Sequence, residues 1–456
     1  MDFIAIISFF QRFRKKSVFL AGILLIAPSA YAEATAQPNW APQLLGMQVT
    51  IIYQNMPAFP SPYEGPNSLT FKNGEGHGHT ETYGVYLGSQ IVPSLQTYLD
   101  IEQARGNGIS RAVGLGGITD GDVIRQGSAN LGTNPYIARL YLRYLFALSP
   151  ETETAVRGRD QLPGAEPLSR IEIKAGKFAA TDDFDLNRYA NDTRTQFMNW
   201  GLMNNTAWDF AADTRGYSYG IMIALVKPSW KLALGIYQMP TTANGNEFDN
   251  HLQDARGDNL ELTVKPNQAG TVIRALAYHN QGRMGDYAKA TAIGLATSST
   301  PNITANERPG RSKYGFGLNL EQPLADDGET GAFARIGWND GNTEDFCFTE
   351  VDRHLSAGAQ VSGAHWGRTD DRLGIAYVWH GLSAEHRDYL AAGGSGFLLG
   401  DGKLNYGFEQ ILETYYRIQI GRYVQLSPDF QYIQNPGYNR DRGPVEVYSL
   451  RLRANY

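Results

Sequence analysis

The chain has 456 residues and a formal net charge of −6, so it lacks the basic excess of a nucleic-acid-binding protein. A single cysteine, Cys347, excludes an internal disulfide framework. Fifty glycines and an aromatic content of 12% are unusual for a soluble enzyme and agree with a β-protein that faces lipid with alternate residues. A secreted soluble β-protein shares this composition, so the choice between a soluble and a membrane β-protein depends on the pattern of residues along the chain.

Residues 1–32 are predicted to be a cleavable signal peptide. Four basic residues between positions 12 and 16 precede an apolar run at 17–27, and Ala30-Tyr31-Ala32 provides a cleavage signal. An apolar run of about eleven residues is too short to cross a bilayer as a helix. Cleavage removes four positive charges and the negative charge of Asp2, a net +3, so the mature charge falls from −6 to −9.

The rest of the chain alternates between apolar and polar residues in one segment after another. Around Arg139 and Arg143, the residues Ala138, Leu140 and Leu142 fall on the opposite, apolar face. The alternation predicts sixteen strands, near 44–53, 79–90, 95–102, 135–146, 170–178, 216–226, 230–238, 259–264, 271–280, 313–322, 331–339, 354–364, 372–381, 409–420, 424–433 and 445–456.

Charged residues recur in the middle of these strands. Arg170, Glu172 and Lys174 alternate with isoleucines, and Arg451 and Arg453 alternate with leucines in the last strand. A two-sheet sandwich also alternates, but charge in the middle of many long strands favours a barrel with a wet lumen.

The connections between these strands alternate in length. Short turns fall near 92–94, 227–229, 265–270, 323–330, 367–371 and 421–423. Long polar connections fall at 54–78, 103–134, 179–215, 239–258, 281–312, 340–353, 382–408 and 434–444. The exception is 147–169, which is too long for a tight turn.

This alternation of length is typical of outer-membrane proteins with short periplasmic turns and long extracellular loops. We therefore predict one domain, residues 33–456, that is an all-β transmembrane antiparallel barrel of about sixteen strands in the bacterial outer membrane. A barrel of this size leaves an aqueous channel, and the even strand number places both termini on one side.

The chain ends on an alternating apolar ladder that closes with an aromatic residue. Tyr448, Leu450, Leu452 and the terminal Tyr456 form this ladder. It resembles the C-terminal signature by which barrel proteins reach the outer-membrane assembly machinery, although phenylalanine is commoner than tyrosine at the end. A simple last edge strand would explain the alternation but not the terminal aromatic residue.

Two stretches of the chain resemble the carbohydrate-selective porins, the OprB-like family. The first contains DDFD (182–185), NRYAND (187–192), RTQFMNW (194–200), AWDF (207–210) and DTRG (213–216). The second contains YLAAGG (389–394), GDG (400–402), ETYYR (413–417) and DFQYI (429–433). The likeness covers about 46–456. It implies a homotrimer of sixteen-stranded channels that favour sugars, which enter down their own gradient.

The third long connection, 179–215, is predicted to fold into the lumen and narrow it. Its large apolar residues would be an aggregation liability if they were exposed: Phe197, Met198, Trp200, Leu202 and Met203. We expect Asn199, Trp200 and Asp209 to contact solute, because sugars need amides, carboxylates and aromatic faces. The alternative is that the loop only packs against the barrel wall or a neighbouring subunit.

Charged residues on the lumen side of the strands are the second candidate for selectivity, since rings of charge set the selectivity of pores. They are Arg139, Arg143, Arg170, Glu172, Lys174, Glu413 and Arg417, with Arg451 and Arg453 in the last strand. The alternative is that these residues have a structural role, because arginines in a lumen often interact with one another and with carboxylates of the loops.

Other motifs predict no cofactor and no metal. His77 and His79 lack a third ligand nearby, and Gly114-Leu115-Gly116-Gly117 lacks the ending of a phosphate loop. An outer-membrane enzyme would need an activated nucleophile with a base in reach, and the sequence offers no such pair. The expected partners are small sugars, outer-membrane lipid and lipopolysaccharide. A porin of the same architecture for small organic anions is the alternative.

Overall fold

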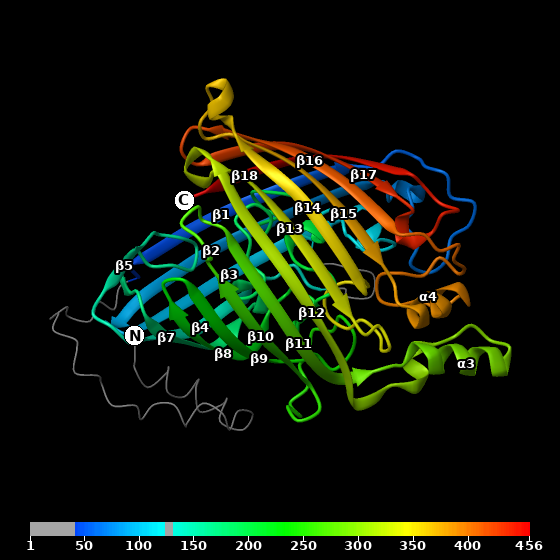
Figure 1. Cartoon of the computed structure of the whole chain (residues 1–456). Coiled ribbons are helices and arrows are strands. Elements are labelled where there is room, and N and C mark those ends of the chain that lie inside the picture. Colours follow the sequence, from blue (N-terminus) through cyan, green and yellow to red (C-terminus); the bar gives the residue numbers. More distant parts are fainter. Residues whose placement is uncertain (1–41, 124–130) are drawn as a thin grey trace. The chain divides into compact units, whose positions relative to one another are not determined.

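A computed structural model describes residues 42–123 and 131–456, and there the chain forms a closed antiparallel barrel (Figure 1). The predicted signal peptide lies outside the described residues. The strands of the barrel are β1 (Leu44–Asn55), β2 (His77–Val92), β3 (Leu95–Asn107), β4 (Tyr136–Ala147), β7 (Arg170–Phe178), β8 (Ser218–Lys227), β9 (Trp230–Gln238), β10 (Arg256–Val264), β11 (Val272–Met284), β12 (Arg308–Ala325), β13 (Thr330–Asn339), β14 (Arg353–Ser362), β15 (Arg372–Gly381), β16 (Glu409–Ile420), β17 (Val424–Gln434) and β18 (Val445–Asn455).

All sixteen predicted strands are confirmed. The barrel closes between its first and last strands, where Gln48 lies opposite Asn455 and Ile52 lies opposite Arg451. The first strand therefore begins and the last strand ends at the same end of the barrel. The largest boundary difference is in β12, which extends beyond the predicted 313–322 because its pairing with β11 continues past an irregularity between Gly282 and Met284.

The two faces of the wall follow the predicted alternation. Leu140 and Leu142 are 41% and 42% exposed on the outside, whereas Arg139 and Arg143 are buried in the interior. The placement of Ala138 on the outer face was wrong. The register with β3 shifts beside Arg139, and this β-bulge turns Ala138 inward, where it is fully buried.

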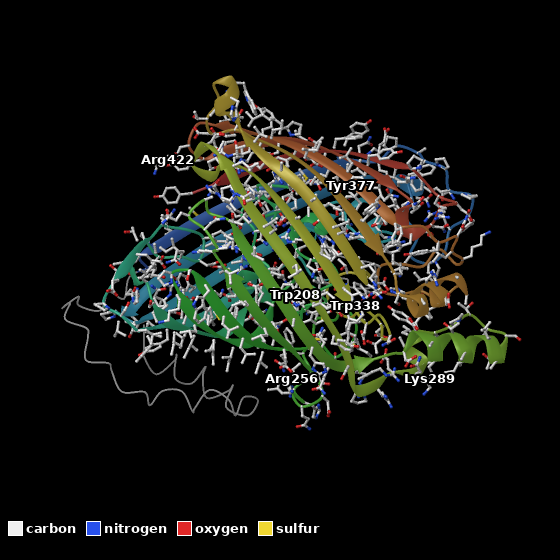
Figure 2. All side chains as sticks on the ribbon, in the orientation of Figure 1. Trp208, Arg256, Lys289, Trp338, Tyr377 and Arg422 are labelled. Atoms are coloured by element: carbon white, nitrogen blue, oxygen red, sulfur yellow. The ribbon has the colours of Figure 1, made fainter. Side chains whose placement is uncertain are left out.

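Aromatic side chains gather on the outer face near the strand ends that carry the long loops. Phe316 of β12 stacks on Trp338 of β13, and Tyr377 and Trp379 of β15 are exposed (Figure 2). Barrels of the outer membrane carry such aromatic girdles where the wall meets the lipid–water interface. None of the helices in the described part of the chain has the length and hydropathy of a membrane-spanning helix.

The connection from β4 to β7, which the sequence marks as too long for a turn, contains a small hairpin. Its strands are β5 (Thr152–Ala155) and β6 (Gly164–Pro167), which form a separate two-stranded sheet. This connection sends side chains into the lumen. Leu162 of this hairpin is buried, and its backbone N–H donates to the hydroxyl of Tyr98 on the inner wall (3.2 Å).

Where the structure describes them, the long loops carry three α-helices, α2 (Trp200–Met203), α3 (Tyr287–Thr297) and α4 (Ala384–Ala391). Loop residues also make up much of the apolar core, which includes Phe184, Trp208, Phe346 and Leu398. These residues pack against inward-facing side chains of the barrel. The interior of the barrel is therefore partly filled by loops.

Candidate functional site

The connection between β7 and β8, residues 179–217, crosses the interior of the barrel, and we call it the lumen loop. The N–H of Asp185 donates to Glu261 of β10 (2.7 Å), and Arg335 of β13 donates to the carbonyl of Ala190 (2.7 Å). Farther along, Arg451 of β18 donates to the carbonyl of Thr193 (2.6 Å). These contacts reach inward-facing residues of well-separated strands, so the predicted position of the loop inside the barrel is confirmed.

The loop residues predicted to contact solute are buried within its packing. The Asn199 side chain caps α2 and donates to Gln431 of β17 (2.9 Å). Trp200 stacks on Phe348 with its ring centre 5.3 Å away, and only 6% of the residue is exposed. Asp209 accepts the N–H groups of three consecutive residues of the 340–352 loop, including Phe346 (2.8 Å). Their observed contacts hold the lumen loop in place.

Glu413 of β16 has the same kind of role. It is fully buried, and its carboxylate accepts the N–H groups of Met198 (2.5 Å) and Asn199 (3.0 Å). The two carboxyl oxygens of Glu413 thus provide partners for backbone N–H groups that are buried inside the barrel. Glu413 therefore fixes the middle of the lumen loop against the wall.

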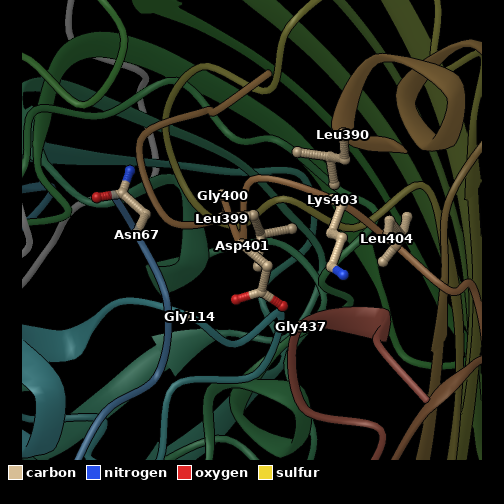
Figure 3. Close-up of a pocket in the computed structure, with 9 residues that line it drawn as sticks. All are labelled: Asn67, Gly114, Leu390, Leu399, Gly400, Asp401, Lys403, Leu404 and Gly437. Carbon is tan, nitrogen blue, oxygen red and sulfur yellow. The ribbon is translucent and has the colours of Figure 1, made fainter. Parts of the chain in front are cut away.

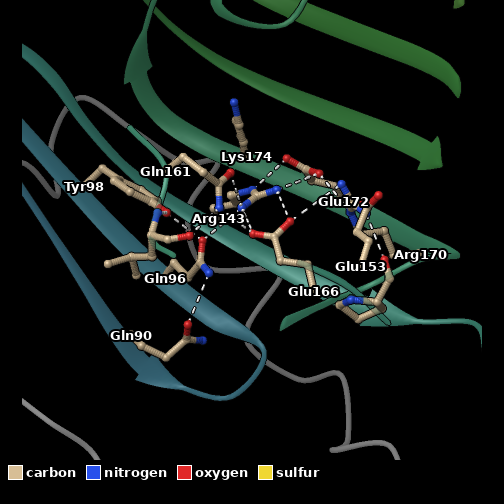
Figure 4. A network of polar contacts seen from close by, with 12 residues as sticks. Gln90, Gln96, Tyr98, Arg143, Glu153, Gln161, Glu166, Arg170, Glu172 and Lys174 are labelled. Atoms are coloured by element: carbon tan, nitrogen blue, oxygen red, sulfur yellow. Dashed lines mark hydrogen bonds and ion pairs between the residues drawn. The ribbon is translucent and has the colours of Figure 1, made fainter. Parts of the chain in front are cut away.

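Five of the predicted lumen residues form one polar network on neighbouring strands, which we call the β4–β7 cluster: Arg139, Arg143, Arg170, Glu172 and Lys174. Arg143 lies at its centre and donates to Glu172 (2.7 Å) and Glu166 (2.5 Å), as Figure 4 shows. Arg170 donates to Glu172 (3.2 Å) and to Glu153 (2.8 Å).

Arg139 and Lys174 connect this cluster to the start of the lumen loop. Arg139 donates twice to Asp182 (2.7 and 2.6 Å), and Lys174 donates to Asp183 (2.6 Å). Burial alone would raise the pKa of Asp182, but the charge and hydrogen bonds of Arg139 lower this pKa to about 2. The Asp182 carboxylate therefore stays ionised, and the pair pins the loop to β4.

Carboxylates of the β5–β6 hairpin complete the network, and the sequence reasoning missed them. Glu153 and Glu166 pair with arginines of the cluster, and Asp160 lies 3.7 Å from Arg139. The one available signal was the length of the 147–169 connection together with its acidic residues. Arg143 and Arg170 lie on the lumen side of the strands, as predicted, and there they face this hairpin rather than the lumen loop.

The arginines of β16 and β18 differ, and we call Arg417, Arg451 and Arg453 the β16–β18 arginines. In the described part of the chain, none of the three has a carboxylate within ion-pair distance, 4.0 Å. Arg451 donates to the carbonyls of Thr193 (2.6 Å) and Gln196 (2.8 Å). Arg417 donates to the carbonyl of Thr195 (3.4 Å).

Buried ionisable groups outside the lumen loop include one set with the geometry of a metal site. Ligand atoms of Asp345, Asp352 and His386 lie within 4.8 Å of one another in the long loops. Lys313 forms a buried ion pair with Asp345, and the His386 ring lies 3.1 Å from Asp352. These charges balance one another in part and join the 340–352 loop to α4, so a metal is not needed to explain the arrangement.

A small pocket lies among the long loops, away from the clusters described above (Figure 3). Asn67, Asp401 and Lys403 are its polar lining residues. Asp401 accepts from Asn439 (2.9 Å) and pairs with Arg442, while Lys403 lies 4.0 Å from the ring centre of Tyr63. The polar groups of this pocket are therefore committed to loop packing.

Comparisons with known proteins agree with the barrel. Residues 89–456 match the protein family described as "Carbohydrate-selective porin, OprB family". A protein of Acinetobacter baylyi named "Putative porin QuiX" is 24% identical over 314 residues, which is 63% of this chain and 66%, just under two thirds, of that relative. The structure of Pseudomonas putida OprB has a TM-score of 0.67 at 13% identity and covers 90% of this chain and 93% of its own.

Proposed function

The chain belongs to the OprB family of carbohydrate-selective porins, and we propose that it forms a passive channel by which small sugars cross the outer membrane. The fold and the family indicate a channel rather than an enzyme. The observation that carries the proposal is the lumen loop. It is fixed inside the barrel by Arg139, Arg335 and Glu413, so the space left for solute is bounded by loop and wall.

The remaining accessible groups suit a polar, uncharged solute as well. Lys174 of β7 and Asp182 of the lumen loop keep 12% and 16% of their side chains exposed. Such donors and acceptors can exchange hydrogen bonds with sugar hydroxyls, each a modest net interaction of about 0.5–1.5 kcal/mol. Weak contacts fit a channel, because solute must enter favourably and still leave.

Reconstitution of the purified protein tests this function. In proteoliposomes we expect swelling with glucose that is faster than with a disaccharide, and in planar bilayers we expect glucose to reduce the ion current. Protein that folds but gives neither swelling nor current would overturn the proposal. The homotrimer, the contacts with lipopolysaccharide and the assembly role of Tyr448, Leu450, Leu452 and Tyr456 stay predictions. The size of the protein–detergent complex tests whether the chain forms a homotrimer.

A second candidate, the passage of small organic anions, is favoured by one observation. In the part of the chain that the structure describes, the β16–β18 arginines face the interior without a carboxylate within 4.0 Å, whereas the charges of the β4–β7 cluster are paired.

A further inference from the structure

Two arginines of the inner wall have most of their hydrogen-bonding capacity unused. A guanidinium has five N–H donors. Among the described residues, Arg417 makes one hydrogen bond, to the carbonyl of Thr195 (3.4 Å), and Arg453 makes one, to the side chain of Asn455 (2.9 Å). The Nε atoms of both are buried and have no partner in residues 42–123 and 131–456. Both side chains are partly exposed, so a solute can reach the remaining donors.

The strand register places these arginines close together on the inner wall. Ser427 of β17 lies opposite Arg451, and the pairing of Ile418 with Leu426 puts Arg417 on the other side of Ser427. Arg417 and Arg451 are thus separated by two strand spacings, roughly 10 Å. Arg453 lies two residues after Arg451 in β18, so both are on the same face of the strand.

The facing segment of the lumen loop supplies few negative charges. Residues 193–196 offer backbone carbonyls to Arg417 and Arg451. The nearest carboxylate on that segment is exposed Asp192, which binds the N–H of Arg194 (3.0 Å) and the hydroxyl of Thr195 (2.8 Å).

The arginines around Asp192 nevertheless affect its pKa. The loss of surrounding water inside the barrel would raise the pKa of Asp192 although its side chain is exposed to the lumen, but the charges of Arg453 and Arg159 outweigh this effect and lower the pKa. Arg159 itself pairs with Asp160 (2.8 Å). Arg451 also has no carboxylate within 4.0 Å among the described residues, but it is buried and donates to two loop carbonyls. The partly exposed cations at this place are therefore Arg417 and Arg453, and the carboxylate of the facing segment is Asp192.

We propose that Arg417 and Arg453 form a binding site for the carboxylate of a small hydroxylated anion, a sugar acid, on its way through the channel. Guanidinium groups bind carboxylates in a bidentate manner. The Asp192 carboxylate and the carbonyls of the lumen loop accept hydrogen bonds from the solute's hydroxyls. The proposal rests on the channel function above and narrows the class of solute.

The structure also explains why such a site releases its solute. Arg417 and Arg453 come from different strands and stay partly exposed, so water competes with every contact. Arg451, which is fully buried and bound to two loop carbonyls, holds the segment opposite them in position. A channel needs this combination of a fixed wall and weak, accessible donors.

Planar bilayers with the full chain test the site, with gluconate as the anionic probe and glucose as its neutral counterpart. At low ionic strength we expect gluconate to block the current at about one tenth of the glucose concentration, since charge-assisted hydrogen bonds are roughly twice as strong as neutral ones. The Arg417→Gln/Arg453→Gln double variant should bring the two concentrations within about twofold, mainly by raising the gluconate concentration that blocks the current. Arg422→Gln, in the exposed turn after β16, is the matched control.

The outcomes separate this inference from the channel function. Equal block by gluconate and glucose in the wild type, or an unchanged preference in the double variant, would overturn the site. Absence of any current would instead overturn the channel function. If the double variant fails to fold, Arg417→Lys and Arg453→Lys keep the charge but remove the bidentate geometry, and each should reduce the preference.

Discussion

The two arginine-rich sides of the barrel wall differ in what faces them. In the β4–β7 cluster, every arginine and lysine has at least one carboxylate within 4.0 Å. Among the β16–β18 arginines, carbonyl and side-chain oxygens of neutral groups take that place. An inward-facing arginine therefore says little about selectivity by itself, because its partner decides whether its charge is available to solute.

The difference comes from the connections that enter the lumen. The β5–β6 hairpin and the start of the lumen loop bring Glu153, Glu166, Asp182 and Asp183 to the β4–β7 cluster. The β16–β18 arginines face the 193–196 segment, which carries threonine, arginine and glutamine. The β4–β7 cluster therefore holds the connections in place, whereas the β16–β18 arginines keep positive charge that can interact with solute.

The largest expected effect is a loss of folding free energy when Arg143 of the β4–β7 cluster is replaced. Arg143→Ala removes the cation between Glu166 and Glu172, both buried, and breaking such a buried pair costs about 3–5 kcal/mol of folding free energy. Urea titration of the barrel in lipid vesicles measures this change. Arg143→Gln combined with Glu172→Gln keeps the net charge and should recover part of the stability. A cost below about 1 kcal/mol for Arg143→Ala would show that the anchor is not structural.

The adjacent residue tests the inside–outside assignment of the same strand. Leu142 is 42% exposed on the outer face, and Leu142→Arg should cost about 2–4 kcal/mol at the lipid midplane. The same vesicle titration measures it. Leu142→Phe keeps the site apolar and is the control. If Leu142→Arg proves as stable as this control, Leu142 does not face lipid.

Glu344 is the acidic counterpart of the β16–β18 arginines: it is a buried carboxyl with no cation within 4.0 Å among the described residues. Burial raises its pKa to about 8, and its carboxylate accepts the N–H of Gly285 (2.9 Å). A group whose pKa is raised by folding stabilises the fold at low pH, and this stability is lost as the pH rises from about 4.5 to about 8.

We therefore expect amide exchange around residues 285 and 344, corrected for the intrinsic rate, to increase across that pH range in the wild type. Glu344→Gln keeps the acceptor for Gly285 and should make the exchange independent of pH. Wild-type exchange that stays constant between pH 4.5 and 8 would contradict the raised pKa.

The barrel could be predicted from the sequence because each strand carries its own signal. The alternation that separates Leu142 from Arg143, and the alternation of short and long connections, depend only on neighbouring residues. Ala138 was misplaced because a β-bulge changes the face of a residue without changing the local pattern.

The site was predicted only in part, because its chemistry depends on contacts between distant segments. The sequence identified Arg139 and Arg417 as inward-facing, but it gave no means of seeing that one meets Asp182 and the other meets a carbonyl. Trp200 and Asp209 were expected to contact solute, yet the structure commits both to loop packing. Partners that lie far apart along the chain decide which charges remain free.

The smallest expected loss of stability is for Arg417, one of the β16–β18 arginines. Arg417→Gln removes one long hydrogen bond, to the carbonyl of Thr195, and no ion pair, so it should cost less than about 1 kcal/mol in the vesicle titration. It removes a positive charge that no carboxylate neutralises, and lumen charges set ion selectivity. The reversal potential in a KCl gradient should therefore shift toward cations. The Arg143→Gln/Glu172→Gln variant, which leaves the net charge unchanged, should leave that potential unchanged. A stability cost for Arg417→Gln equal to that of Arg143→Ala, with no shift in the reversal potential, would mean that both sides of the wall are anchors.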